Sequence, residues 1–176
     1  MNWSEKCSKI TAIVLDVDGV LTDGRIGYRD NGDEVKFFDV KDGHGIVLAR
    51  RAGLKVGILS GRKSKANAVR VAELKLDFFI EGCLNKDEGL TRLLEQEKLL
   101  PEECMYIGDD LVDAPPMRRC GLAVAVGDAA PELDRIADLR LKSPGGRGAV
   151  REAVELLLKE QGKWSELLKR YLGPSC

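Results

Sequence analysis

Two groups of acidic residues have the types and spacing that metal-assisted chemistry requires. Asp16 and Asp18 are separated by one residue, and Asp109 and Asp110 are followed by Asp113. Carboxylates brought together in this number repel one another unless a cation lies between them. Mg²⁺ is a hard cation that prefers carboxylate oxygens, retained waters and phosphate oxygens. These residues therefore predict a magnesium site, provided that the fold brings the two groups together.

A hydroxyl group and an ammonium group complete the set. Ser60 and Lys86 offer donors that suit phosphate oxygens. The single histidine and the five widely spaced cysteines exclude a paired-histidine zinc site and give no disulfide framework. We therefore predict phosphoryl transfer, with Asp16 as the nucleophile that forms an aspartyl-phosphate. Asp18 would protonate the leaving oxygen and then activate the water that cleaves this intermediate.

Short apolar runs precede these polar residues, as expected for buried strands that deliver them to one place. The runs cover residues 13–15, 55–59, 78–80, 104–107 and 122–126. Helical stretches are predicted near 45–52, 63–74, 88–96 and 112–119, with further helices over 149–160 and 164–172. This alternation predicts an α/β fold, a doubly wound parallel sheet of Rossmann-like type. Because the carboxyl ends of parallel strands meet at one edge, the polar residues should lie close together there.

A hairpin interrupts this alternation. The β-prone segments 25–28 and 35–38 flank Asp-Asn-Gly-Asp at 30–33, and Asn-Gly between such segments is a strong hairpin signal. We predict a projecting β-hairpin over about 25–38. It would serve assembly or, alternatively, would be a simple edge protected from aggregation by Arg25, Arg29 and Lys36.

Length and composition indicate one ordinary globular unit. The 176 residues are 44% hydrophobic and 32% charged, which predicts a single domain over 1–176. The formal net charge of -1 gives no basic field for nucleic acid or anionic lipid, and we expect neither partner. The chain has no run of 18 apolar residues, and residues 1–10 lack the apolar region of a signal peptide. We therefore expect a cytoplasmic protein.

The order of the motifs resembles that of the haloacid dehalogenase superfamily. The stretches that carry the resemblance are Asp16-Val17-Asp18-Gly19-Val20-Leu21-Thr22, Ser60-Gly61-Arg62, Lys86 and Gly108-Asp109-Asp110-Leu111-Val112-Asp113. The resemblance implies that Mg²⁺ is held by Asp16, by the backbone carbonyl of Asp18 and by Asp109, with Asp110 and Asp113 in support. It also implies that Ser60 and Lys86 hold the transferred phosphoryl group.

No cap domain is expected. The chain between Asp18 and Ser60 is taken up by the hairpin and one helix, and that between Ser60 and Lys86 by one helix and one strand. An uncapped site does not exclude water and reads little of the substrate beyond its phosphate. A neighbouring subunit is therefore expected to cover it.

Within the superfamily, the chain is similar to the capless phosphatases that act on eight-carbon keto-deoxy sugar acid phosphates. The similar stretches are 37–45, 60–63 and 145–152. The resemblance implies a homotetramer with central hairpins, C-terminal tails (about 145–176) that approach adjacent active sites, and a place in lipopolysaccharide precursor biosynthesis. Arg62 is the leading candidate for the substrate carboxylate, since a guanidinium can bind it bidentately. Lys63, Arg147 and His44 follow.

Several alternatives stay open from the sequence. The substrate would instead be a nine-carbon sugar acid phosphate, although Arg62 favours the eight-carbon one. The chain would otherwise be a non-catalytic oligomerisation module, or a receiver domain, whose phosphorylated aspartate follows its third strand rather than the first. Ser60 would be only a helix cap, Lys86 a surface lysine, and His44 and Arg147 solvated residues.

The Gly-Gly-Arg-Gly at 145–148 would bring a guanidinium and a helix N-terminus towards an anion.

Overall fold

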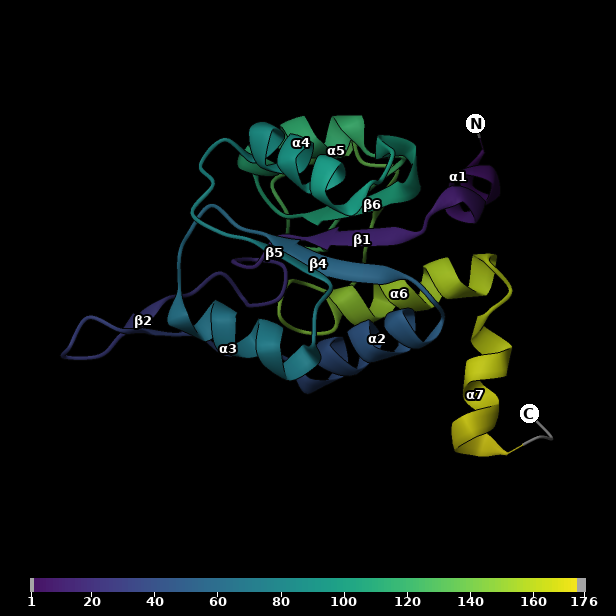
Figure 1. Cartoon of the computed structure of the whole chain (residues 1–176), viewed down its shortest axis with the longest axis horizontal. Helices are drawn as coiled ribbons and strands as arrows, with labels where there is room; N and C mark the ends of the chain where they lie inside the picture. Colours follow the sequence, from purple (N-terminus) through teal and green to yellow (C-terminus); the bar gives the residue numbers. More distant parts are fainter. Residues whose placement is uncertain (1, 174–176) are drawn as a thin grey trace.

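A six-stranded parallel sheet forms the centre of the molecule (Figure 1). The computed structural model describes residues 2–173, so Met1 and residues 174–176, which include Cys176, lie outside it. The strand order is β5-β4-β1-β6-β7-β8. The strands are β1 (Ala12–Leu15), β4 (Lys55–Leu59), β5 (Phe78–Ile80), β6 (Cys104–Gly108), β7 (Leu122–Ala125) and β8 (Leu139–Arg140). The predicted doubly wound sheet is confirmed.

Helices cover both faces of the sheet (Figure 1). They are α1 (Trp3–Lys9), α2 (Val40–Arg51), α3 (Lys65–Leu74), α4 (Lys86–Glu97), α5 (Ala114–Arg119), α6 (Ala149–Glu160) and α7 (Trp164–Leu172). Short 3₁₀ turns cover Pro101–Glu103, Leu111–Asp113 and Pro131–Arg135. Helices α4 and α5 lie on one face, and α2, α3 and α6 lie on the other. None of the helices within residues 2–173 is long and apolar enough to cross a membrane.

The register of the central strands places the carboxyl ends of β1, β4 and β6 side by side at one edge of the sheet. Leu15 at the end of β1 pairs with Ile58 of β4 on one side and with Ile107 of β6 on the other. All three side chains are fully buried, because helices cover both faces of these strands. The connection after β1 leads to α2 on one face and the connection after β6 leads to α5 on the other, so a crevice opens between these two strands at the carboxyl edge. The polar residues that follow the strands are therefore delivered to one crevice.

The hairpin stands apart from the main sheet. Strands β2 (Gly27–Tyr28) and β3 (Glu34–Val35) pair antiparallel as a separate two-stranded sheet that projects from the body (Figure 1). The strands are shorter than expected at the ends away from the turn, since residues 25–26 and 36–38 lie outside them, and the Arg29 N–H donates to the Asp33 carbonyl next to the turn. The hairpin and α2 occupy the chain between β1 and β4, and no cap domain is present among the described residues.

Two elements were not predicted, and one began earlier than expected. Helix α1 is short and has few apolar residues that would indicate a helix. Asn2 and Glu5 stabilise its start, because the side chain of each accepts a hydrogen bond from the backbone N–H of the other. Strand β8 has only two residues. Helix α2 starts at Val40 rather than near residue 45, because the Asp39 carboxylate accepts hydrogen bonds from the first turn. Four cysteines, at 7, 83, 104 and 120, are free and buried, as expected for small apolar residues.

Candidate active site

A buried lysine lies between two carboxylates at the carboxyl edge of the sheet. Asp16 directly follows β1, and Lys86 opens helix α4. Lys86 Nζ lies 2.8 Å from Asp16 Oδ2 and 2.6 Å from Asp113 Oδ1, and its side chain is only 4% exposed. Because both carboxylates are also buried, the ammonium group neutralises charge that water does not reach. Lys86 is therefore placed to offset the negative charge of Asp16.

Asp113 orders the acidic loop. Its Oδ1 also accepts a hydrogen bond from the Tyr106 hydroxyl at 2.8 Å, and its Oδ2 accepts from the backbone N–H groups of Asp109 at 3.1 Å and Asp110 at 3.3 Å. Oxygens of Asp16, Asp109 and Asp113 all lie within 4.8 Å of one another. Because both oxygens of Asp113 already have partners, we assign it the support of the loop rather than a free ligand atom.

Asp109 offers an oxygen that has no partner within the chain. Its buried Oδ1 has no hydrogen-bond partner among residues 2–173, and its Oδ2 lies against the backbone of Gly19. A Cβ on Gly19 (φ +93°) would lie 2.0 Å from that Oδ2, so this close approach requires glycine. Burial, and then the charge of Asp113, raise the pKa of both Asp16 and Asp109 despite the nearby lysine. The acids therefore need more positive charge, and a divalent cation fits them.

A hollow of about 170 Å³ is lined by all four predicted catalytic residues. Its lining consists of Asp16, Asp18, Ser60, Gly61, Arg62, Lys86, Asp109, Asp110 and Val112. Ser60 is almost fully buried at the end of β4, and its hydroxyl accepts a hydrogen bond from the Arg62 N–H at 3.3 Å. The Asp110 carboxylate caps the following 3₁₀ turn by accepting from the Leu111 N–H at 2.7 Å. This cap is the structural role that an acidic residue at such a position also fills.

Asp18 contacts the hairpin rather than the other acids. Lys36 Nζ lies 2.6 Å from Asp18 Oδ1 and 3.6 Å from Glu34 Oε2, and the Lys36 side chain has no exposed surface. Glu34 in turn pairs with Arg62, whose Nη2 lies 2.7 Å from Oε1 and also donates to the Tyr28 hydroxyl at 3.2 Å. Arg62 Nε lies 4.0 Å from Asp18 Oδ2. The hairpin thus does not line the hollow itself, but it contacts two residues that do, Asp18 and Arg62.

Sequence reasoning missed Glu34, and the alternative in which Lys36 protects an exposed hairpin edge is wrong for this residue, because its side chain is buried. Residues 34 and 36 lie on one face of an extended strand, because side chains alternate along it. Their opposite charges on that face were the available signal. The prediction failed because a hairpin outside the main sheet gives no hydrophobic pattern to show which face is covered.

Three of the four candidate substrate-binding residues lie outside this hollow of the same chain. Lys63 packs its methylene groups over Gly82. Arg147 lines a separate hollow together with Asp23 and Asp128, among others. His44 lies under α7, where its ring meets that of Tyr171 edge to face. Only Arg62 lines the hollow that contains Asp16.

The glycine-rich stretch before α6 has a different role from the expected one. The Asp42 carboxylate already occupies the N-terminus of α6, accepting from the N–H groups of Gly148 at 3.1 Å and Arg151 at 2.8 Å. That helix end is therefore not available to an anion of the substrate. Gly145 lies against the loop after β1, where a Cβ would be 1.7 Å from the Gly19 carbonyl oxygen. The glycines allow this backbone packing.

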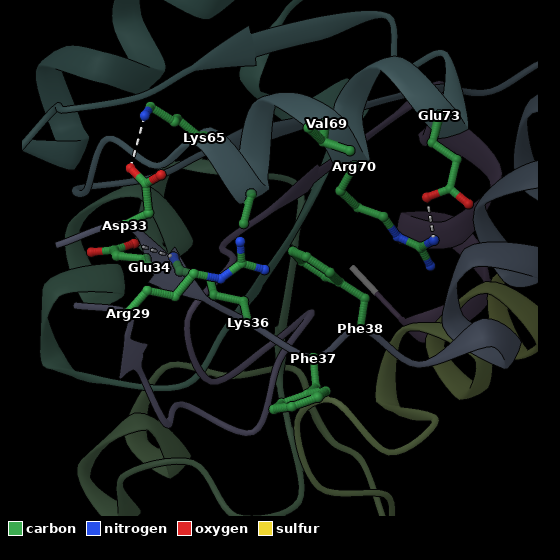
Figure 2. A pocket seen from close by; sticks show the side chains of 11 residues that line it. Arg29, Asp33, Glu34, Lys36, Phe37, Phe38, Lys65, Val69, Arg70 and Glu73 are labelled. Atoms are coloured by element: carbon green, nitrogen blue, oxygen red, sulfur yellow. Dashed lines mark hydrogen bonds and ion pairs between the residues drawn. The ribbon is translucent and has the colours of Figure 1, made fainter. Parts of the chain in front are cut away.

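A larger hollow of about 530 Å³ lies between the hairpin and α3 (Figure 2). Glu34 and Lys36 line it from the hairpin, and Val69 and Arg70 line it from α3. Phe37 is 80% exposed at its margin. Because Glu34 and Lys36 also contact Asp18 and Arg62, these two side chains stand between the larger hollow and the catalytic one.

Comparisons with known proteins agree with this geometry. Residues 61–152 match the family model of haloacid dehalogenase-like hydrolases. The 3-deoxy-D-manno-octulosonate 8-phosphate phosphatase of Escherichia coli strain K12 is 46% identical over 161 residues, which are 92% of this chain and 86% of that protein. The Haemophilus influenzae protein of the same name is 40% identical, with 92% of this chain and 89% of that protein covered.

A solved structure adds the same family in three dimensions. The 3-deoxy-D-manno-octulosonate 8-phosphate phosphatase from Moraxella catarrhalis, in complex with magnesium ion, phosphate ion and a KDO molecule, superposes with a TM-score of 0.92. It is 33% identical, and the match covers 96% of this chain and 97% of that one. The chain therefore belongs to the haloacid dehalogenase-like hydrolases, within the family of the 3-deoxy-D-manno-octulosonate 8-phosphate phosphatases.

Proposed function

We propose that this protein is a Mg²⁺-dependent phosphatase that hydrolyses 3-deoxy-D-manno-octulosonate 8-phosphate, in lipopolysaccharide precursor biosynthesis. The observation that carries the proposal is the gathering of Asp16, Asp18, Lys86 and Asp109 around one hollow at the carboxyl edge of the sheet. The names and the bound molecules of the family members support the substrate.

Asp16 is the nucleophile in this proposal. One of its carboxylate oxygens attacks phosphorus, the bond between phosphorus and the sugar oxygen breaks, and Asp18 gives a proton to that departing oxygen. Asp18, now ionised, then takes a proton from the water that attacks the aspartyl-phosphate, and free phosphate leaves. Lys86 and Ser60 hold the phosphoryl oxygens, and Lys86 keeps Asp16 ionised through its ion pair.

Asp16, the backbone carbonyl of Asp18 and Asp109 would hold the metal ion, with Asp110 and Asp113 in support. When bound, Mg²⁺ neutralises the charge that develops on the phosphoryl oxygens. The unpartnered Oδ1 of Asp109 and the raised pKa values of Asp16 and Asp109 support this ligand set.

Arg62 would bind the substrate carboxylate. Its guanidinium is 46% exposed at the mouth of the hollow and is held by Glu34, so the substrate carboxylate would compete with Glu34 for it. Lys63, Arg147 and His44 lie outside the hollow of their own chain, and we propose that residues of this group act at a site completed by a neighbouring subunit.

We further propose that the chain is a single phosphatase domain, that it assembles as a homotetramer through its hairpins, and that it works in the cytoplasm. The exposed Phe37 and Tyr28 on or beside the hairpin support an assembly surface. Sedimentation velocity tests the assembly: a tetramer is expected, and a monomer at micromolar concentration would contradict it.

The substrate proposal is tested by phosphate release in the presence of Mg²⁺. The eight-carbon and nine-carbon keto-deoxy sugar acid phosphates, hexose phosphates and an aryl phosphate are compared, with the Asp16→Asn variant as the control. We expect a strong preference for the eight-carbon acid. Preference for the nine-carbon acid would replace the substrate, and a folded tetramer without turnover on any phosphate would favour an oligomerisation module.

A further inference from the structure

Lys36 is the single lysine of the hairpin segment 25–38, and its side chain has no exposed surface. Lys and Arg are almost never fully buried unless they are paired. Here the pairing partner is Asp18, at 2.6 Å, with Glu34 as a second and more distant carboxylate. We propose that Lys36 is a positioning residue, which fixes the Asp18 carboxylate for proton transfer to the leaving oxygen.

The contact divides the two oxygens of Asp18. Oδ1 is buried and lies against the ammonium group as an ion pair, without an aligned hydrogen bond. Oδ2 faces the side of Arg62, whose Nε is 4.0 Å away. Because one oxygen is occupied, the other is the oxygen left to carry the proton, and rotation of the carboxylate would break the ion pair. The lysine thus selects both the rotamer and the oxygen that exchanges the proton.

The surroundings of Lys36 belong to the hairpin and to the hollow beside α3. Its side chain lines the hollow between the hairpin and α3, and Glu34 is 13% exposed beside it (Figure 2). Lys36 follows β3 directly, so its position depends on the hairpin and not on the main sheet. The positioning of Asp18 therefore depends on an element outside the strands that carry Asp16 and Asp109.

The inference rests on the proposed acid and base role of Asp18, and it predicts a dependence on the leaving group. The departing sugar oxygen is a poor leaving group that needs a proton, whereas a nitrophenolate leaves without one. The ratio kcat/KM reports the steps up to departure of the leaving group, so it excludes the later cleavage of the aspartyl-phosphate when that departure is irreversible.

The experiment measures kcat/KM of the full-length protein with Mg²⁺ on two substrates, 3-deoxy-D-manno-octulosonate 8-phosphate and p-nitrophenyl phosphate. Lys36→Met is compared with wild type and with Lys65→Met, which removes a lysine of the same region that pairs with Asp33 and is 84% exposed. Lys36→Met is expected to lose about 10²-fold on the sugar phosphate and less than about 5-fold on the aryl phosphate. Lys65→Met is expected to match wild type on both.

Melting temperatures separate a folding defect from a loss of positioning. If Lys36→Met does not fold, the double variant Glu34→Gln with Lys36→Met also removes the second carboxylate charge beside the lost ammonium group, and Glu34→Gln alone is its control. Equal losses on both substrates, or no loss on either, would overturn the inference. A wild-type protein that is inactive on both substrates would overturn the proposed phosphatase instead, so the two failures are distinct.

Discussion

Two groups of residues around the catalytic hollow, named the sheet wall and the hairpin wall, differ in how they are built. The sheet wall consists of Asp16, Lys86, Asp109 and Asp113, which are placed by the ends of parallel strands and by the turns that follow them. The hairpin wall consists of Glu34 and Lys36, which reach Asp18 and Arg62 from a separate two-stranded sheet.

The difference assigns different parts of the reaction to the two walls. The sheet wall is buried and cross-linked by ion pairs, which suits phosphoryl chemistry that depends on fixed charge. The hairpin wall contacts Arg62, whose side chain is 46% exposed, and Asp18, and these are the groups proposed for the substrate carboxylate and the leaving oxygen. Loss of a sheet-wall residue should therefore affect every phosphate ester, whereas loss of a hairpin-wall contact should affect some substrates more than others.

The largest effect is expected at the nucleophile of the sheet wall. Asp16→Asn keeps the shape of the side chain but removes the attacking oxygen, so turnover should fall by about 10⁴-fold or more on sugar and aryl phosphates alike. Phosphate release with Mg²⁺ measures this. A variant that keeps activity on either substrate would contradict the mechanism.

Lys86→Met should reduce both stability and activity. The substitution leaves Asp16 and Asp113 without their shared buried cation, which is expected to cost about 3–5 kcal/mol of unfolding free energy. Urea unfolding measures the stability, and activity is measured on the folded fraction. Lys65→Met serves as the exposed control. A loss of unfolding free energy below about 1 kcal/mol, the size typical of an exposed ion pair, would show that the sheet wall does not depend on this cation.

Arg62→Met should separate substrates on the hairpin wall. The lost charged contact is expected to raise KM for the sugar acid phosphate by about 10-fold or more and to leave that for an aryl phosphate nearly unchanged. Initial-rate kinetics on both substrates measure the split. An equal change on both would remove Arg62 from carboxylate recognition.

The smallest effect is a pH-dependent stabilisation by Mg²⁺. Burial raises the pKa of Asp16 and Asp109 above the ordinary 3.8, so between 3.8 and the raised values the folded metal-free protein holds more protons than the unfolded chain. Its unfolding free energy should therefore fall as pH rises through that window.

Magnesium requires the ionised carboxylates, so its stabilising effect should grow over the same window. Saturating Mg²⁺ should raise the melting temperature by about 5 °C at neutral pH and by less at acidic pH. Thermal unfolding with Mg²⁺ and with a chelator measures the difference, and Asp109→Asn is the control that should lose it. A Mg²⁺ effect that does not change with pH would contradict the assignment of these acids to the metal.

The sheet wall could be predicted from the sequence, because its residues follow short apolar runs, Asp16 and Asp109 directly and Lys86 and Asp113 after a short turn. Asp16 and Ser60 follow β1 and β4, and parallel pairing with matched register brings such strand ends to one edge. The same logic located Asp109 after β6. The order of the strands did not need to be known, since only their common direction places the side chains.

The hairpin wall could not be predicted in the same way. Burial of Lys36 depends on how a two-stranded hairpin lies against α3, and the local sequence has no hydrophobic periodicity that predicts this packing. Asp42 is a similar case, because the capping of α6 joins residues more than a hundred positions apart. Long-range packing of polar groups thus limited the prediction, whereas the strand ends did not.

The most direct test of the central claim is the location of the phosphoryl group during turnover. Wild-type protein with Mg²⁺ and 3-deoxy-D-manno-octulosonate 8-phosphate is quenched in acid within milliseconds and mapped by peptide mass spectrometry. We predict an acid-stable, base-labile phosphoryl group on Asp16, formed and lost as fast as the protein turns over. A phosphoryl group on another residue would contradict the account. So would turnover without phosphorylated Asp16 both in the wild type and in an Asp18→Asn variant given p-nitrophenyl phosphate, whose leaving group needs no proton and which should let the intermediate accumulate.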